Sequence, residues 1–145
     1  MPPIMDLLVA AGAVCVHDDA VLLVREQGRW NPPLGCREPG EALAETARRE
    51  AREEAGVEVE VGDIAYVIEY IQPDGQGRTL QVFFEARLVA GHPCPNDPDG
   101  EIEGARWVPF RDLEATPLRG AHHGLALQAY LSGRRGGHHF VDRRP

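Results

Sequence analysis

Three glutamates close to the end of a predicted helix are the residues of this chain whose types and spacing best suit chemistry. Glu50, Glu53 and Glu54 stand at positions i, i+3 and i+4, so their carboxylates share one helix face. They fall in the last turns before Gly56, where the helix dipole disfavours anions by roughly 0.3–1 kcal/mol each. Carboxylate oxygens are ligands of Mg²⁺, which completes its coordination with water and phosphate oxygens. The cluster therefore indicates a site for a hard divalent cation.

The alternative is a solvated acidic face whose charge is neutralised by neighbouring arginines. Arg49 has acids four residues away on both sides, and Arg52 lies in the same segment. Such pairing accounts for any one acid, but a helix optimised only for stability would carry basic residues at this end. The preceding loop adds Glu38 and Glu41, and Gly35 allows its backbone to approach a ligand closely. These additions favour the cation site.

The charge balance limits the partners that the chain can bind. Among its 145 residues, 15 are basic and 23 are Asp or Glu, which gives a net charge of −8. This acidity argues against binding nucleic acid through its phosphates. All the basic residues are Arg, so the lysine of a P-loop ATPase, a Schiff-base enzyme or a protein kinase is excluded. Arg29 and Arg78 are candidates for a terminal phosphate, although solvated surface arginines would look the same.

The cysteines and the longest apolar run indicate where the protein works. The chain has 3 cysteines, too scattered for a disulfide framework. Its longest apolar run, residues 7–16, is shorter than the roughly 18 residues that a membrane span requires, and no basic residue precedes it as in a signal peptide. We therefore expect a cytoplasmic protein with no membrane partner.

Hydrophobic periodicity and turn residues predict a mixed α/β fold. The predicted strands cover residues 7–17, 20–25, 57–61, 64–71, 79–89 and 105–109, and the predicted helices cover residues 41–55 and 122–131. The first two strands form a hairpin, and small apolar residues on the first helix predict close packing on a sheet. We expect one domain over residues 1–133 and a flexible tail over residues 134–145.

The segment from Gly35 to Val57 resembles a complete Nudix box. Gly35 is followed after five residues by Glu41, and after seven more by Arg49-Glu50-Ala51-Arg52-Glu53-Glu54-Ala55-Gly56-Val57. The resemblance implies an α/β/α Nudix sandwich with a mixed β-sheet. It also implies an enzyme that hydrolyses a nucleoside diphosphate linked to another group, giving a nucleoside monophosphate and a second phosphorylated product.

The same resemblance implies roles for the charged residues of the box. Glu50 and Glu54 would be the main ligands of Mg²⁺ or Mn²⁺, and Glu53 a further ligand. Arg49 would hold the glutamates in place, and Glu41 would support the loop or bind a second metal. These roles fit the chemistry, because a phosphoanhydride needs charge neutralisation and an activated water.

The loop before the helix departs from the usual family pattern at one position. Many members have Pro-Gly-Gly there, whereas this chain has Pro33-Leu34-Gly35. Leu34 and Gly35 are expected to lie against the substrate, with the backbone carbonyl near Leu34 facing the metal. A carboxylate that takes the proton of the attacking water can come from the helix or from a later loop. The candidates are Glu53, Glu101 and Glu103, and the sequence does not choose among them.

The substrate is predicted less sharply than the reaction. Pro73 stands sixteen residues after Val57, a position that accompanies ADP-ribose activity in some Nudix enzymes, although Pro-Asp-Gly is also ordinary turn chemistry. ADP-ribose or another NDP-sugar is therefore the first substrate prediction. The alternatives are removal of pyrophosphate from (d)NTPs and a non-catalytic nucleotide-binding regulatory module, against which the intact box argues. Aromatic residues at strand spacing could stack a base or fill the core; they are Tyr66, Tyr70, Phe83 and Phe84. A homodimer is consistent with the family.

Overall fold

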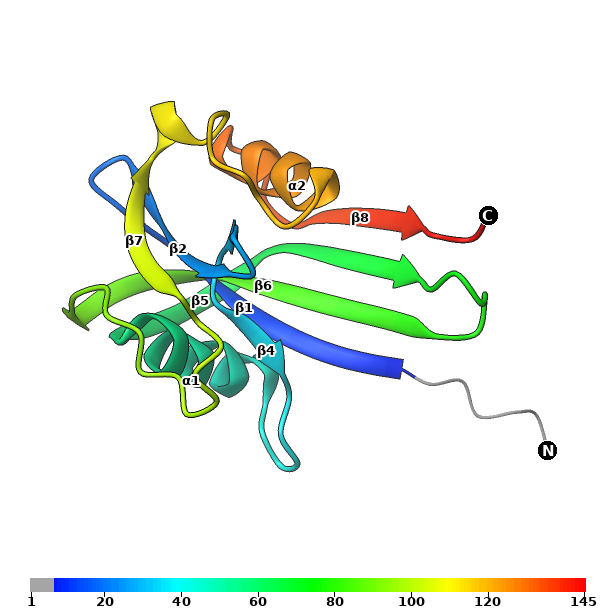
Figure 1. Ribbon diagram of the computed structural model, residues 1–145, viewed down its shortest axis with the longest axis horizontal. Coiled ribbons are helices and arrows are strands. Elements are labelled where there is room, and N and C mark those ends of the chain that lie inside the picture. The colour runs from blue at the N-terminus through cyan, green and yellow to red at the C-terminus, as the bar shows by residue number, and fades with distance from the viewer. Residues whose placement is uncertain (1–6) are drawn as a thin grey trace.

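The computed structural model describes residues 7–145, in which a mixed eight-stranded sheet lies between two helices (Figure 1). The strands are β1 (Leu7–His17), β2 (Ala20–Glu26), β3 (Arg29–Asn31), β4 (Leu34–Cys36), β5 (Val57–Ile71), β6 (Arg78–Gly91), β7 (Gly104–Pro109) and β8 (Gly137–Asp142). The helices are α1 (Leu43–Ala55) and α2 (Ala121–Leu131), and a 3₁₀ turn covers Phe110–Asp112. The strand order is β3-β2-β1-β6-β5-β8, with β4 paired to β1 and β7 to β2. The predicted α/β class and mixed sheet are confirmed.

The N-terminal hairpin forms as predicted, but most of its first strand pairs elsewhere. Asp18 and Asp19 have φ values of 50° and 57°, the left-handed conformation of a tight hairpin turn. Beyond the turn, β1 pairs in parallel with β6 from Leu7 opposite Arg78 to Cys15 opposite Ala86. The centre of the sheet is therefore built from segments that are far apart in the sequence.

Helix α1 packs on one face of the sheet through its small residues. Ala47, Ala51 and Ala55 are fully buried and form one core cluster with residues of β1, β2 and β5. Their short side chains let the helix backbone approach the strands closely. The predicted apolar face of this helix is confirmed. In the described part of the chain, neither helix is long and apolar enough to span a membrane.

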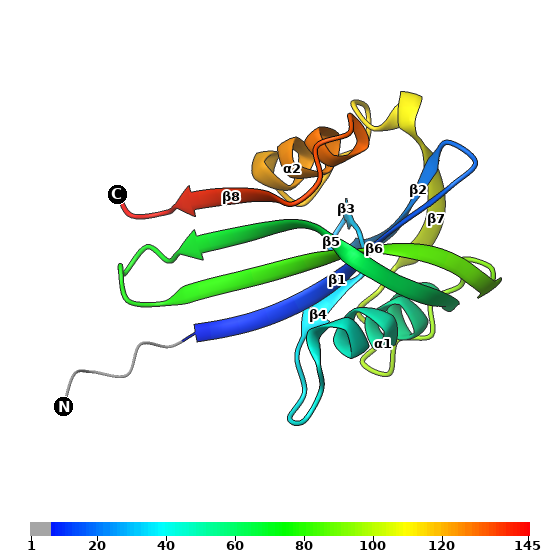
Figure 2. The same cartoon turned by 180° about the vertical axis from the view of Figure 1, so that it is seen from behind.

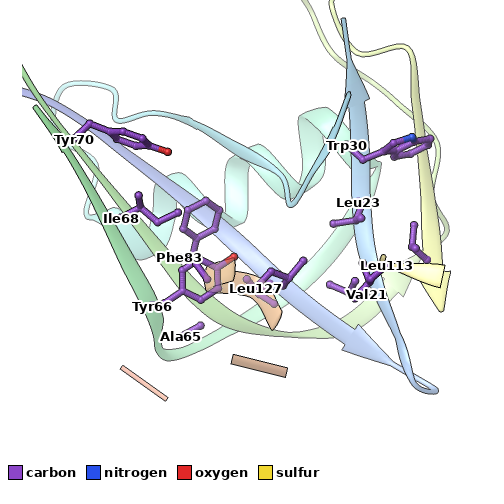
Figure 3. Close-up of a cluster of buried hydrophobic side chains, with 13 residues drawn as sticks. Val21, Leu23, Trp30, Ala65, Tyr66, Ile68, Tyr70, Phe83, Leu113 and Leu127 are labelled. Carbon is purple, nitrogen blue, oxygen red and sulfur yellow. The ribbon is translucent and has the colours of Figure 1, made fainter. Parts of the chain in front are cut away.

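The opposite face of the sheet carries a second core cluster under α2 (Figure 3). The rings of Tyr66 and Phe83 are stacked with centroids 4.7 Å apart, and Leu127 of α2 belongs to the same cluster. Tyr66 and Phe83 are 1% and 0% exposed, so these two aromatic residues fill the core and are not free to stack a base.

Two predicted strands are one continuous element in the structure. Strand β5 runs from Val57 to Ile71 without a break, although the sequence suggested separate strands on either side of Gly62 and Asp63. Its pairing with β6 shifts register between Val61 and Ile64 and again before Tyr66. A β-bulge of this kind absorbs unpaired residues while the strand continues, so the loss of alternation did not end it.

The expectation of a flexible tail from residue 134 is wrong, because that segment contains β8. This strand pairs in parallel with β5, from Gly137 opposite Tyr66 to Asp142 opposite Ile71, at the edge of the sheet (Figure 2). The N–H of Gly136 also donates to the carbonyl of Ala65 at 2.8 Å. Only Gly137 of β8 is buried. Because the strand buries so little, its residues show no hydrophobic alternation that would predict it. Backbone pairing with a distant strand supplies the order.

A buried histidine on α2 makes the fold sensitive to acid. His123 is 4% exposed, and its Nε2 lies 2.9 Å from the Tyr70 hydroxyl. Burial, with further contributions from His122, Arg119 and Arg143, lowers the pKa of His123 to about 3. Below about pH 6.5 the unfolded chain binds a proton at this residue that the folded protein does not bind. The free energy of unfolding should therefore fall as the pH falls from 6.5, by about 2 kcal/mol at pH 5 from this group.

We expect His123→Asn to be less acid-sensitive than the wild-type protein, whatever its stability at pH 7. The measurement is urea unfolding at pH 7 and pH 5 for the wild type, His123→Asn and His92→Asn, because His92 is an exposed histidine in a loop. His92→Asn should follow the wild type. An equal loss of stability at pH 5 in all three proteins would contradict the assignment.

Candidate active site

A cleft of about 650 Å³ gathers most of the residues that the sequence singled out. Its lining residues come from β2, β4, α1 and the loops around them. Seven predicted site residues line it: Leu34, Gly35, Arg49, Glu50, Glu53, Glu54 and Glu101. The other four predicted residues do not line it: Arg29, Glu41, Arg78 and Glu103. The predicted acidic helix end is therefore the wall of a real cleft.

Glu54 and Glu50 are held as partly desolvated carboxylates. The Glu54 Oε1 atom accepts a hydrogen bond from the N–H of Leu34 at 2.8 Å. Burial raises the pKa of Glu54 to about 8, partly offset by that hydrogen bond. Burial also raises the pKa of Glu50, partly offset by Arg49. Both shifts show that the negative charge lacks full compensation within the protein, which is what a cation site requires.

Gly35 leaves room for the Glu50 carboxylate beside the strand β4. A Cβ atom at position 35 would lie 2.1 Å from Glu50 Oε1 and 2.2 Å from its Cδ, closer than any normal contact. Only a residue without a side chain at position 35 leaves the space that the Glu50 carboxylate occupies. The family departure at Leu34 leaves this arrangement in place, because the Leu34 backbone N–H still binds Glu54.

We expect Gly35→Ala to lower kcat at least tenfold, because the added methyl group displaces the Glu50 carboxylate from the cleft. Substrate hydrolysis and the thermal unfolding temperature should be measured together, so that loss of activity is separated from loss of fold. Gly62→Ala is the matched control, since its Cβ would meet nothing closer than 3.7 Å. Full activity in folded Gly35→Ala would show that the position of Glu50 is unimportant.

Arg49 connects the helix carboxylates to the preceding loop. Its Nε and Nη2 donate to the two oxygens of Glu41 at 2.7 and 3.0 Å. Its Nη1 donates to Glu50 Oε1 at 2.8 Å and to Glu53 Oε2 at 3.2 Å, and its Nη2 also donates to the carbonyl of Cys36 at 3.0 Å. The guanidinium thus orients two helix glutamates and the loop at once.

Glu41 is engaged as a structural acceptor. Besides Arg49, its Oε1 accepts from the N–H of Glu38 and from the hydroxyl of Thr46, each at 2.9 Å. The hydrogen bond from Arg49 lowers the pKa of Glu41 to about 2. Both of its oxygens are occupied within the protein. This geometry supports the loop-holding role that the resemblance implied more than that of a metal ligand.

The end of α1 is capped by the loop that follows β6. Gly56 adopts φ 71°, and a Cβ there would lie 2.1 Å from the Cys94 carbonyl oxygen. The N–H groups of Cys94 and Asn96 donate to the carbonyls of Ala55 and Glu53, both at 2.9 Å. These bonds satisfy carbonyls that the helix end leaves free and hold the loop against the carboxylate face.

This loop carries an acid that the sequence analysis missed. Asp97 lines the cleft beside the helix glutamates. Its Oδ2 accepts from the N–H groups of Glu101 and Ile102 at 2.7 and 3.2 Å. Asp97 thereby fixes the loop segment that brings Glu101 to the cleft. In the sequence, Asp97 belongs to a run of Pro, Asp and Gly typical of a turn, and its spacing from other acids matches no metal-binding motif.

Glu103 has a different place from the one that the sequence suggested. Its Oε1 accepts from the N–H of Gly28 at 2.8 Å and lies 3.8 Å from Arg25 Nε, at the turn between β2 and β3. It does not line the cleft. Of the three predicted candidates for the base, Glu53 and Glu101 line the cleft and Glu103 does not; Asp97 lines it as well.

The two arginines predicted to bind a terminal phosphate do not line the cleft, whereas another arginine does. Arg78 donates to the carbonyl of Gly75 at 3.2 Å, in the turn between β5 and β6. Arg29 donates to the carbonyl of Leu118 at 3.3 Å and lines a small cavity next to the cleft, but not the cleft itself. Arg119, which the sequence analysis missed, lines both the cleft and that cavity, with its Nη2 3.5 Å from Glu26 Oε2.

The cleft residues fit a hard divalent cation. The side chains available at the end of α1 are carboxylates, and the pKa of both Glu50 and Glu54 is raised by burial. Among the described residues, no three acidic, His or Cys side chains already converge as a metal site. In this arrangement Arg49 holds Glu50 and Glu53 through the same Nη1 atom.

Comparison with known proteins identifies the class to which this fold and cleft belong. Residues 6–128 match the NUDIX domain, so the chain belongs to the Nudix family. It is a Nudix hydrolase of the pyrophosphohydrolase class. Proteins of this family act on small nucleotide substrates and typically depend on a divalent metal.

Individual relatives agree with this assignment. The chain is 32% identical over 130 residues to "Phosphatase NudJ" of Escherichia coli K12, which covers 85% of this chain and 83% of the relative. A NUDIX hydrolase from Nitrosomonas europaea superimposes with a TM-score of 0.81 at 21% identity, covering 99% of this chain and 82% of that chain. An ADP-ribose pyrophosphatase from Streptococcus suis gives a TM-score of 0.68 at 25% identity, covering 92% and 98%.

Proposed function

We propose that the protein hydrolyses, with a divalent metal, the phosphoanhydride bond of a nucleoside diphosphate linked to another group. The observation that carries this proposal is that Glu50, Glu53 and Glu54 all line one cleft and that burial raises the pKa of Glu50 and Glu54. Such uncompensated carboxylates need a cation, and a cation in turn attracts phosphate oxygens.

Besides these carboxylates, the lining of the cleft includes Arg119 and Glu38. On one side, Glu54 and Arg119 line the same small cavity. On the other side, Arg49 Nη1 lies next to Glu50 and 3.6 Å from Glu38 of the preceding loop. A nucleoside diphosphate linked to a sugar has organic groups on both sides of its anhydride, whereas a nucleoside triphosphate has one. The shape supports the former as substrate.

The residues of the cleft divide the work. Glu50 and Glu54, with Glu53, would hold Mg²⁺ or Mn²⁺, which when bound neutralises phosphate charge and lowers the pKa of water. Arg49 positions the glutamates, and Arg119 binds a phosphate oxygen. Glu53, Glu101 or Asp97 accepts the proton of the attacking water. In this arrangement the attacking water and the substrate phosphate would lie between α1 and the loop that carries Asp97 and Glu101.

The structure places Pro73, the residue on which the ADP-ribose prediction rested, away from the cleft. Pro73 is exposed in the turn between β5 and β6 and does not line the cleft. Its position sixteen residues after the box therefore has the ordinary explanation of turn chemistry. We propose an NDP-sugar or a related NDP-linked compound, with ADP-ribose as one member of the set to be tested.

The test is product analysis with Mg²⁺ and then Mn²⁺ over ADP-ribose, other NDP-sugars, NADH, diadenosine polyphosphates and the (d)NTPs. A nucleoside monophosphate from an NDP-linked substrate, and no comparable turnover of (d)NTPs, is the expected result. Pyrophosphate released from a (d)NTP would instead show a nucleotide-pool enzyme. Tight nucleotide binding without turnover of any substrate would show a regulatory module.

A further inference from the structure

A second, smaller pocket opens on the α2 face of the sheet, next to the cleft. It has a volume of about 150 Å³, and Arg119 lines both hollows. Its lining residues are Tyr70, Gln72, Thr79, Gln81, Arg119, His123 and Arg143. We propose that this pocket binds the base of the substrate and selects bases that carry a ring carbonyl next to a ring N–H. This inference rests on the proposed function, because the pocket would serve the same substrate.

Two polar atoms of the pocket residues are buried without a partner. Gln81 Oε1 and His123 Nδ1 have no hydrogen-bond partner among the described residues. His123 is 4% exposed, and its other ring nitrogen is engaged by the Tyr70 hydroxyl at 2.9 Å. Gln72, by contrast, is held in place because its Nε2 donates to Thr79 Oγ1 at 2.9 Å. Buried polar atoms are normally paired, so the unpaired atoms of Gln81 and His123 indicate that the pocket takes a polar ligand.

The charges of the pocket favour a ligand that accepts hydrogen bonds. Arg119 and Arg143 both line it, and no carboxylate does. The Arg143 guanidinium lies over the Tyr70 ring, 4.6 Å from its centroid, and its backbone N–H donates to the carbonyl of Ile71. Because the ring supports its plane, Arg143 presents donors at a fixed orientation. The pocket therefore offers guanidinium donors beside the amide acceptor of Gln81.

A cyclic amide edge matches this combination better than the other ligand chemistries that a nucleotide provides. Its carbonyl accepts from a guanidinium, as in the common contact of Arg with guanine O6, and its adjacent N–H donates to Gln81 Oε1. Adenine has no carbonyl for the guanidiniums. A phosphate group would satisfy Arg119 and Arg143 but would turn oxygen toward the Gln81 oxygen. Guanine, hypoxanthine, uracil and thymine are bases that present the required edge.

Arg119 lies between the proposed base pocket and the catalytic cleft. It lines the pocket on the α2 face and also lines the cleft that contains Glu54. A nucleotide whose base occupies the pocket would lead its phosphates past Arg119 toward the helix carboxylates. Its linked group would then lie on the far side, toward Glu38.

The test compares GDP-glucose, UDP-glucose and ADP-glucose, which share the linked sugar and differ in the base. We expect kcat/KM for the guanine and uracil substrates to exceed that for ADP-glucose by roughly tenfold or more. Gln81→Leu should lower kcat/KM for these two substrates about tenfold, through KM, and change ADP-glucose by less than threefold. Gln76→Leu, in an exposed turn, is the matched control and should change none of them.

Arg143→Ala provides a second variant in case Gln81→Leu unfolds, because Arg143 is exposed near the chain end. It should also reduce the preference for carbonyl-bearing bases, whereas Arg134→Ala, another exposed arginine, should not. An enzyme that hydrolyses all three sugars equally, with both pocket variants affecting them equally, would overturn the inference and leave the proposed function intact.

Calorimetric binding of GMP, UMP and AMP gives a readout that does not depend on turnover. We expect GMP and UMP to bind more tightly than AMP, and Gln81→Leu to remove the difference. Base-selective binding without hydrolysis of any substrate would support the pocket and contradict the proposed function. Equal binding of the three monophosphates, unchanged in Gln81→Leu and in Arg143→Ala, would contradict the pocket whether or not the protein is an enzyme.

Discussion

Glu54→Gln is expected to lower kcat by a hundredfold or more, and Glu50→Gln to do the same, while both proteins remain folded. A hundredfold loss corresponds to about 2.7 kcal/mol of transition-state stabilisation. The glutamine oxygen can still accept the hydrogen bond that Leu34 N–H gives to Glu54 Oε1, so the loop should stay in place. What disappears is the negative charge that a metal requires. The measurement is steady-state hydrolysis of an NDP-sugar over a range of Mg²⁺ concentrations.

Glu45→Gln is the matched control for both substitutions. Glu45 lies on the same helix, is exposed, and does not line the cleft. It should keep wild-type activity. The metal-free Glu54→Gln protein should be at least as stable as the wild type, because a buried carboxylate that lacks full compensation has been removed. Wild-type turnover by a folded Glu54→Gln protein would end the metal-site assignment.

Arg49→Ala is the second substitution for which a large effect is expected, again a loss of kcat of about a hundredfold. The change leaves Glu41, Glu50 and Glu53 without the guanidinium that orients them. Because Arg49 and Glu41 are mostly buried, with side chains each 16% exposed, the protein should also lose about 3 kcal/mol of stability. Arg49→Lys keeps the charge but cannot reach three acids at once, so most of the kcat loss should remain.

The comparison with Arg48→Lys shows whether geometry or charge is responsible. Arg48 is the exposed neighbour of Arg49 on the same helix, and its conversion to Lys should change neither kcat nor the urea midpoint. Full recovery of kcat in Arg49→Lys would show that charge alone suffices at this position. The fork of hydrogen bonds would then have no role in catalysis.

The parts of the fold that the sequence predicted are those whose signals are local. Alanines at three- and four-residue spacing place α1 on the sheet, and Gly56 ends it in the left-handed conformation. The carboxylates of the box then follow from helix geometry alone. For this reason the positions of Glu50, Glu53 and Glu54 could be predicted together, although their contacts with Gly35 and Leu34 could not.

The parts that the sequence did not predict depend on distant partners. Strand β8 owes its order to β5, and its own residues carry no hydrophobic alternation. Asp97 and Arg119 reach the cleft from loops whose positions are set by the helix end and by the start of α2. A loop acid and a surface arginine look like many others until the fold brings them to one place.

The parallel pairing of β1 with β6 also has a consequence for how the chain folds. The paired residues Leu7 and Arg78 are separated by about 70 positions, so the central strand has no neighbour on that side until more than half of the chain exists. Contacts of such long sequence separation slow folding, because a large loop must close before they form. During synthesis, the box helix would emerge before its sheet is complete. We therefore expect the carboxylates that line the cleft to become organised only in a late, cooperative step.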